Sequence, residues 1–152
     1  MSYQKRGYIV QGAADAFVAV AIDTNLTAEG KSGWQIESMS GYFVNGELGA
    51  AADADVNLLL TTQATVTVFS DEEEIYRLNW AVANTAGVAV AYPLTLVKRE
   101  ELITPRLTVQ PIIHVQISST LSGIACAFYY EFTYSIVKLT DLEVLRMLQG
   151  GV

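Results

Sequence analysis

The sequence contains one cysteine, one histidine and three prolines in 152 residues, and only 16% of its residues are charged. Because Cys126 is alone, no intrachain disulfide can form, and we expect this thiol to be a small buried hydrophobe. The single histidine, His114, would have to serve any Ser-His-Asp or Cys-His arrangement, and no G-x-S-x-G motif accompanies it. His and Cys are also too few for a zinc site within one chain. We therefore expect no enzymatic activity, no cofactor and no metal.

Basic residues are scarce as well, with nine Lys and Arg against sixteen Asp and Glu and a formal net charge of −7. A nucleic-acid surface needs clustered basic side chains, and Lys5 with Arg6 is only a short basic stretch. We expect no direct contact with nucleic acid.

Apolar runs of about 18 residues, the length of a membrane-spanning helix, are missing too. The stretch 5–22 has the basic start and small residues of a secretion signal, but Gln11 and Asp15 interrupt it. We interpret it as two strands and expect no membrane span.

What the chain does contain is β-branched and aromatic residues in period-2 alternation, separated by turns rich in Gly, Asn and Asp. The predicted strand segments are 7–12, 15–22, 34–44, 56–70, 71–83, 88–97, 104–118 and 124–139. Polar loops are expected at 23–33 and at the charged stretch KREE, 98–101, and Asn45-Gly46 is a hairpin signal. Pro105 and Pro111 indicate strand ends or an edge strand, because proline cannot donate to a ladder.

Two segments show the alternation most clearly. Tyr76, Leu78, Trp80 and Val82 share one face of the first. In the second, Phe128, Tyr130, Phe132, Tyr134 and Ile136 share one face, and Tyr129 lies on the other. Both tryptophans and most tyrosines are predicted to be core, with Tyr129 the best exposed exception; the alternative is that the aromatics line a sugar-binding face.

About eight or nine strands, with no intervening helices, predict an all-β antiparallel sandwich or barrel. We favour a single jelly roll with a short C-terminal α-helix, because eight strands suit two packed four-stranded sheets; an immunoglobulin-like sandwich is the alternative. The prediction is one domain, 1–152, with strands at about 7–138 and the helix at about 140–149.

One acidic stretch imitates a metal motif. Asp53, Asp55 and Asn57 have the spacing that opens an EF-hand loop. The continuation fails, because Leu58 stands where the loop needs Gly and Ala64 where it needs a bidentate Glu. We interpret the stretch as an exposed turn entering a strand, with a weak calcium site of another type as the alternative.

Two further patterns have simple interpretations. The acidic run 71–74, DEEE, is expected to be a solvated turn that discourages edge pairing, rather than a patch for cations. The stretch 30–33, GKSG, lacks the upstream glycine and following helix of a phosphate-binding loop, so we expect an ordinary loop. His114 is expected to face solvent or an interface beside Gln116.

The C-terminal helix is the best punctuated element of the chain. Thr140 and Glu143 form a capping box, T-x-x-E, Asp141 adds favourable charge to the first turn, and Gly150 with Gly151 stops the helix. Roughly nine residues are marginal as an isolated helix, so docking must stabilise it.

Apolar residues occupy more than half of this helix, so it must cover an open sheet end or dock on another subunit. The candidate interface residues are Leu142, Leu145, Met147, Leu148 and, on the sheet, Tyr129.

The strand rhythm over about 7–138 resembles that of small single jelly-roll coat proteins of viruses and phages. The resemblance implies a structural, self-assembling virion subunit, made in the host cytoplasm, whose partners are itself and possibly other virion proteins. Many such proteins carry a basic arm for the genome, which MSYQKR does not match, so genome contact would be indirect. The alternative is a carbohydrate- or ligand-binding sandwich module, with a cytoplasmic location as the alternative to the virion. An enzyme such as a cupin would need several metal-binding histidines.

Overall fold

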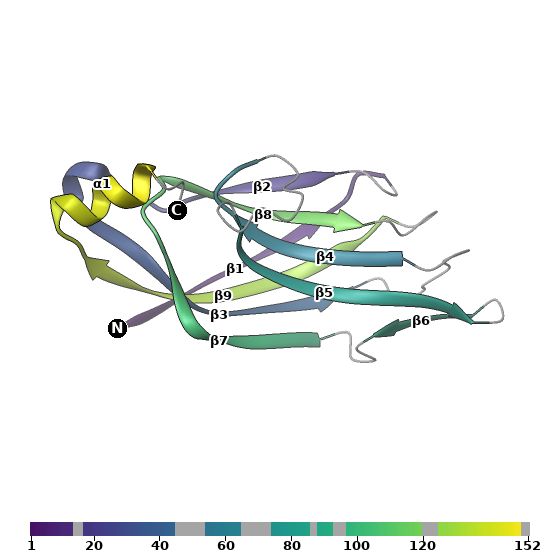
Figure 1. The fold of residues 1–152 in the computed structure, drawn as a ribbon. Coiled ribbons are helices and arrows are strands. Elements are labelled where there is room, and N and C mark those ends of the chain that lie inside the picture. Colours follow the sequence, from purple (N-terminus) through teal and green to yellow (C-terminus); the bar gives the residue numbers. More distant parts are fainter. Residues whose placement is uncertain are drawn as a thin grey trace.

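The chain forms a sandwich of two antiparallel β-sheets with a short helix at one end (Figure 1). The ranges that the computed structural model describes are 1–13, 17–44, 54–64, 74–85, 88–92, 97–119 and 125–149. Several sequence predictions fall outside them, namely the Asn45-Gly46 turn, Asp53, residues 65–70, the acidic residues 71–73 and the stop at Gly150 and Gly151. Among the helices of the described ranges, none is long and apolar enough to cross a membrane.

Nine strands and two helical segments make up these ranges. The four-stranded sheet has the order β1 (Ser2–Val10), β9 (Ala127–Lys138), β3 (Ser32–Phe43) and β7 (Val97–Thr108). The five-stranded sheet has the order β2 (Val18–Asp23), β8 (Ile112–Ser119), β4 (Ala54–Thr61), β5 (Glu74–Thr85) and β6 (Val88–Tyr92). The 3-10 helix η1 (Ala28–Gly30) precedes β3, and the helix α1 (Asp141–Gln149) follows β9.

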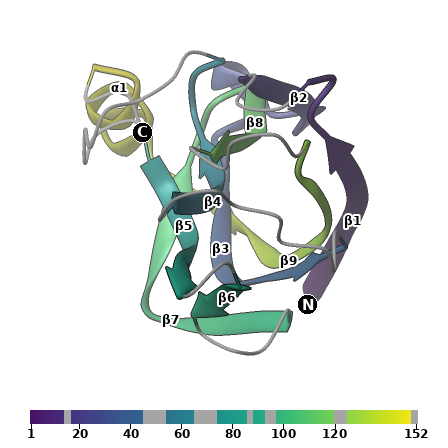
Figure 2. The same ribbon diagram turned by 90° about the vertical axis from the view of Figure 1, so that its right-hand side faces the viewer.

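The strand pairing confirms the jelly roll. β1 pairs with β9, β2 with β8, β3 with β7 and β4 with β5, so the antiparallel pairs are nested one inside the next. Successive pairs lie alternately in the four-stranded and the five-stranded sheet. Figure 2 shows the two sheets facing each other across the interior. This alternation between sheets is the jelly-roll topology, and the immunoglobulin-like alternative is not adopted.

The core lies between the inward faces of the two sheets. Leu78 and Trp80 of β5 are fully buried, as their alternation predicted, and Phe128 and Phe132 of β9 are fully buried opposite them. The rings of Trp80 and Phe128, one from each sheet, lie 5.0 Å apart between centroids. Tilted aromatic pairs at this spacing are favourable, so this contact joins the two layers. Trp34 and Cys126 are also buried, as predicted.

The structure corrects two predictions about strand limits. The charged stretch 98–101 is not a loop, because it lies inside β7 and pairs with residues 38–41 of β3. β7 is the edge strand of the four-stranded sheet. The same edge position accommodates Pro105, as predicted. β1 begins at Ser2 rather than Gly7, because the whole of β9 is available to pair with it.

One residue of the predicted inward face of β9 departs from the pattern. Ile136 is exposed, although Phe128 and Phe132 on the same face are buried. Ile136 lies two residues before the end of β9, and Figure 1 shows that this end of β9 lies beside α1. Near it, the ring of Tyr134 stacks on that of Trp34 at 3.7 Å between centroids.

Candidate functional site

The helix α1 begins at the predicted capping box. The backbone N–H and hydroxyl of Thr140 donate to the Glu143 carboxylate at 2.7 and 2.8 Å, and the N–H of Glu143 donates back to Thr140 Oγ1 at 3.3 Å. The hydrogen bond from the Thr140 backbone is the largest cause that holds the pKa of Glu143 below its usual value. The helix start is therefore fixed by local chemistry.

Contacts with the turn before β3 attach the helix to the sandwich. Lys31 has a left-handed backbone conformation, with φ of 46°, and its carbonyl accepts from the N–H of Leu139 at 2.7 Å. Its ammonium group lies 3.0 Å from Asp141. Residues 30–33 thus connect η1 to β3 through Lys31, which holds the start of α1.

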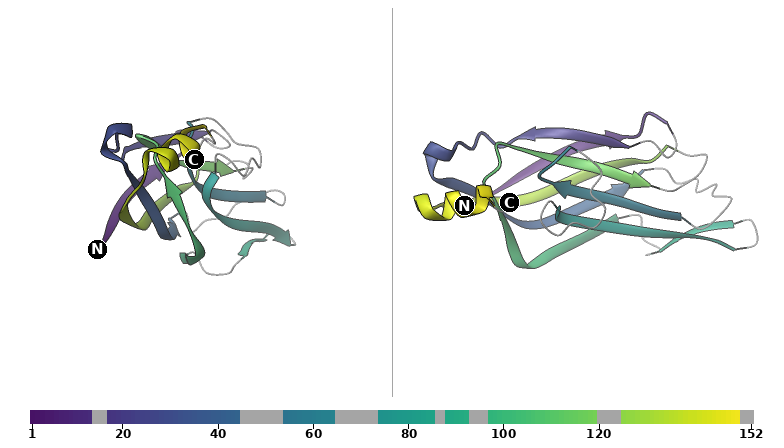
Figure 3. Two further views of the ribbon diagram at one scale, coloured as in Figure 1. Left: turned by 60° about the vertical axis from the view of Figure 1, so that its left-hand side comes forward. Right: turned by 45° about the horizontal axis from the view of Figure 1, so that its top comes forward.

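The leucine face of α1, defined as Leu142, Leu145 and Leu148, points to solvent. These side chains are 57%, 56% and 40% exposed, whereas Val144 is only 5% exposed and Met147 is half-buried. Spacing of three residues keeps the leucines within one arc of the helix. Figure 3 shows α1 at the end of the sandwich, outside both sheets. Of the predicted interface residues on the helix, only Met147 is substantially covered by the domain itself.

A second exposed apolar feature crosses the outer face of the four-stranded sheet. Tyr8, Tyr129 and Tyr42 occupy directly opposite positions on β1, β9 and β3 and are 49%, 56% and 41% exposed; we call them the tyrosine row. The rings of Tyr8 and Tyr129 lie 4.8 Å apart between centroids. Sequence reasoning identified Tyr129 but not its two neighbours, because only the register across three strands brings residues 8, 42 and 129 together.

A charged pair lies next to the tyrosine row. Two residues further along the strands, Arg6 and Glu131 are opposite each other, and the Arg6 Nε donates to the Glu131 carboxylate. The Arg6 Nη2 also donates to the Gln4 amide oxygen at 3.1 Å, and the Ser40 hydroxyl donates to the Glu131 carbonyl at 3.5 Å. The positive charge of Arg6 is therefore balanced within the surface.

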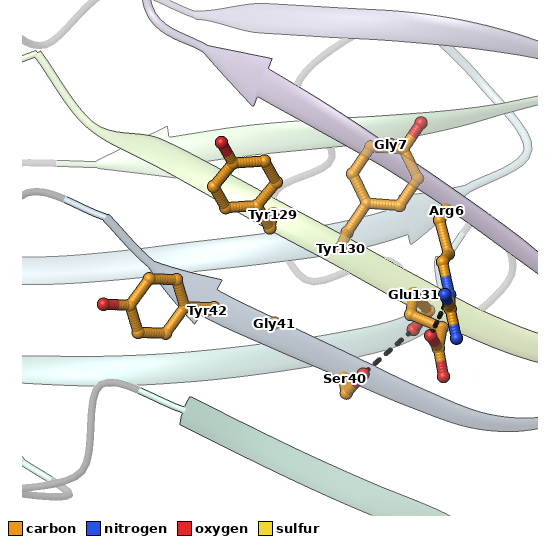
Figure 4. Close-up of a pocket in the computed structure, with 8 residues that line it drawn as sticks. All are labelled: Arg6, Gly7, Ser40, Gly41, Tyr42, Tyr129, Tyr130 and Glu131. Atoms are coloured by element: carbon orange, nitrogen blue, oxygen red, sulfur yellow. Dashed lines mark hydrogen bonds and ion pairs between the residues drawn. The ribbon is translucent and has the colours of Figure 1, made fainter.

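Tyr42 and Tyr129 of the tyrosine row, together with the Arg6–Glu131 pair, border a depression of ≈330 Å³ (Figure 4). Its lining residues are Arg6, Gly7, Ser40, Gly41, Tyr42, Tyr129, Tyr130 and Glu131. Gly7 and Gly41 flank Tyr130 on the neighbouring strands, and Tyr130 points into the sandwich beside Gly7 while Tyr129 and Tyr42 point outward. The depression thus combines exposed ring faces with both hydrogen-bond donors and acceptors.

The other residues singled out in the sequence lie apart from this depression. His114 is half-buried on the outer face of the five-stranded sheet, and burial lowers its pKa. Beside it, Gln116 is buried and donates to Thr61 Oγ1 at 2.6 Å. Among the residues that the structure describes, none provides a hydrogen-bond partner for the buried His114 Nδ1.

The described residues of the two acidic motifs, Asp55, Asn57 and Glu74, lie in strands β4 and β5 rather than in the expected turns. Asn57 accepts a hydrogen bond from Asn79 at 2.9 Å, and Asp55 is exposed on β4. Glu74 binds the Arg77 guanidinium with both oxygens. Within the described ranges, no three His, Cys, Asp or Glu residues are grouped so as to hold a metal ion.

Comparison with known proteins gives likenesses among solved structures only. No protein-family model matches the chain, and no curated protein sequence matches it. A solved structure of desmodium yellow mottle tymovirus is similar over 91% of this chain and 87% of that chain, with a TM-score of 0.38 and 8% sequence identity.

Proposed function

We propose that this chain is a structural subunit that self-assembles, as a component of a virion shell or as a protein attached to one, with no catalytic role. The observation that carries the proposal is the exposed leucine face of α1 on a jelly-roll sandwich. Coat proteins of the type that the strand rhythm resembles associate through sheet edges, loops and terminal segments, and α1 is a segment of this kind. The proposed location is the virion, with synthesis in the host cytoplasm.

Burial of the leucine face would contribute usefully to association. Leu142, Leu145 and Leu148 are each about half exposed, so covering them would contribute on the order of 2–5 kcal/mol. A nine-residue helix is marginal by itself, and among the helix residues whose burial the structure describes, only Val144 is deeply buried. A partner over the leucines would therefore also stabilise the helix.

The charge pattern of α1 favours a second copy of the same chain as that partner. Its acidic residues, Asp141 and Glu143, lie in the first turn, and its basic residue, Arg146, lies in the last. In an antiparallel pair of helices, the acidic first turn of each copy would lie at the same end of the contact as the last turn of the other copy, which carries Arg146. A two-fold contact of this kind is self-complementary.

Light scattering and electron microscopy of the purified full chain test the proposal. We expect rings, shells or defined oligomers that form with increasing protein concentration. A strict monomer at high concentration would overturn the proposal.

A pair of variants locates the contact. Leu145→Glu, on the leucine face, is expected to abolish assembly while leaving the fold intact. Val10→Glu, at a comparably exposed aliphatic residue (48%) in β1, is the control and is expected to assemble normally. If Leu145→Glu assembled as well as the control did, α1 would not be the contact.

A further inference from the structure

We propose that the depression beside the tyrosine row binds a neutral pyranose ring of a glycan. The proposal is independent of self-assembly, because it concerns a different face of the molecule. It rests on the juxtaposition of two exposed tyrosines, Tyr42 and Tyr129, with a charge-balanced Arg6–Glu131 pair around one hollow.

The exposed tyrosines and the Arg6–Glu131 pair match the two kinds of surface that a sugar ring presents. One face of a pyranose carries C–H groups and is apolar, so it stacks on aromatic rings such as those of Tyr129 and Tyr42. Its hydroxyl groups lie around the rim and require both donors and acceptors. The Arg6 guanidinium supplies donors, and the Glu131 carboxylate supplies acceptor positions, next to the ring faces. Both side chains reach solvent, at 70% and 28% exposure.

The size of the hollow agrees with a small ligand. Its volume, ≈330 Å³, falls at the lower end of the range of roughly 300–1,000 Å³ that is typical of ligand sites. The exposed halves of three tyrosines amount to roughly 200–400 Å², because a whole aromatic side chain buries about 150–250 Å². A stable protein interface needs roughly 800 Å² on each partner, so the tyrosine row is too small to be one by itself.

The charges distinguish a neutral sugar from an anionic ligand. Arg6 is neutralised by Glu131 and bonded to Gln4, and the chain has a net charge of −7. A nucleic-acid strand would also stack bases on tyrosines, but it requires uncompensated positive charge along its phosphates. A neutral hexopyranose has no such requirement. We therefore assign the site to a neutral sugar.

Nuclear magnetic resonance of the full chain with labelled tyrosine rings tests this assignment. The probes are the methyl pyranosides of glucose, galactose, mannose and N-acetylglucosamine, each titrated to about 100 mM, since a single ring on an open site is expected to bind with millimolar affinity. We expect saturable shifts of the Tyr8, Tyr42 and Tyr129 rings with at least one glycoside. The absence of a saturable shift with all four would overturn the proposal.

Variants separate stacking from hydrogen bonding. Tyr129→Ala is expected to weaken binding about tenfold, because it removes an aromatic stacking partner. Tyr129→Phe keeps the ring and should retain most of the affinity, and Glu131→Gln should weaken binding by removing acceptor capacity. Leu145→Ala, on α1, is the control and should bind as the parent chain does. Unchanged affinity in both Tyr129→Ala and Glu131→Gln would exclude this site.

Two other occupants of the same face would give different results. If a second copy covered the tyrosine row, the ring shifts would depend on protein concentration without any sugar. If single-stranded nucleic acid bound there, a short oligothymidine would shift the rings and the effect would weaken with added salt. Either result, in place of sugar binding, would contradict the proposal.

Discussion

The phenol ring of Tyr130 packs against the backbone of Gly7, in the space that a side chain at position 7 would fill. A methyl group on Gly7 would overlap the hydroxyl end of the Tyr130 ring. The two residues are direct partners on β1 and β9, so the register of this strand pair places them together. The packing of one buried tyrosine thus depends on the absence of a side chain on the neighbouring strand.

Gly7→Ala should therefore destabilise the protein by about 1–3 kcal/mol, the usual cost of forcing an extra methyl into a packed site. Chemical denaturation measures this as a lower midpoint. Gly12→Ala is the matched control, because a Cβ there has no atom within 4 Å. Equal midpoints for the two variants would show that the Tyr130 ring can move away at no cost.

The single histidine gives stability a dependence on pH. Burial lowers the pKa of His114 from 6.5, so the unfolded chain binds a proton at higher pH than the folded chain does. The contribution of His114 to the free energy of unfolding is therefore complete above about pH 6.5, and it is lost as the pH falls below that value. Urea denaturation at several pH values should show this decline, and His114→Gln should reduce it. An identical decline in the variant would mean that other groups cause it.

Much of the fold could be predicted from the sequence, because alternation directly reports which residues are buried. Period-2 alternation alone predicts that Leu78, Trp80 and Phe128 belong to the core, and all three are fully buried. The capping box likewise predicted where α1 begins, because it depends on residues only three positions apart.

The candidate surfaces depend on longer-range relationships that the sequence does not show. The tyrosine row needs residues 8, 42 and 129 in register across three strands, which only the nested jelly-roll pairing sets. Which apolar side of α1 meets the sandwich was also not evident, since Val144 is buried while Leu142 is exposed. Both depend on how elements far apart in the sequence meet, so local pattern is insufficient.

The capping box predicts a second, local effect of pH. Hydrogen bonds from Thr140 lower the pKa of Glu143 below its usual 4.5, so the ionised form stabilises the start of α1. This stabilisation is present above about pH 4.5 and is lost as the pH falls through the lowered pKa. Amide hydrogen exchange in α1 should accelerate over that acidic range.

Thr140→Ala tests the cause of the shift in Glu143. The variant removes the hydroxyl donor and the oxygen that accepts from the Glu143 N–H, so α1 should exchange faster even at neutral pH. The pKa of Glu143, followed by its carboxyl carbon resonance, should move up toward the usual value. An unchanged pKa would show that the Thr140 side chain is not among its causes.

The attachment of α1 gives a final contrast between two apolar residues of one helix. Val144 is buried against the domain, so Val144→Ala should cost about 1–2 kcal/mol, because two methyl groups leave a packed site. Leu142 is 57% exposed, so Leu142→Ala should change the stability of the dilute monomer by less than about 0.5 kcal/mol. Denaturation at low protein concentration compares the two, and assembly at high concentration should show the reverse order, with Leu142→Ala the more damaging. If Leu142→Ala destabilised the dilute monomer as much as Val144→Ala did, the leucine face would be packed against its own domain and would not be free for a neighbour.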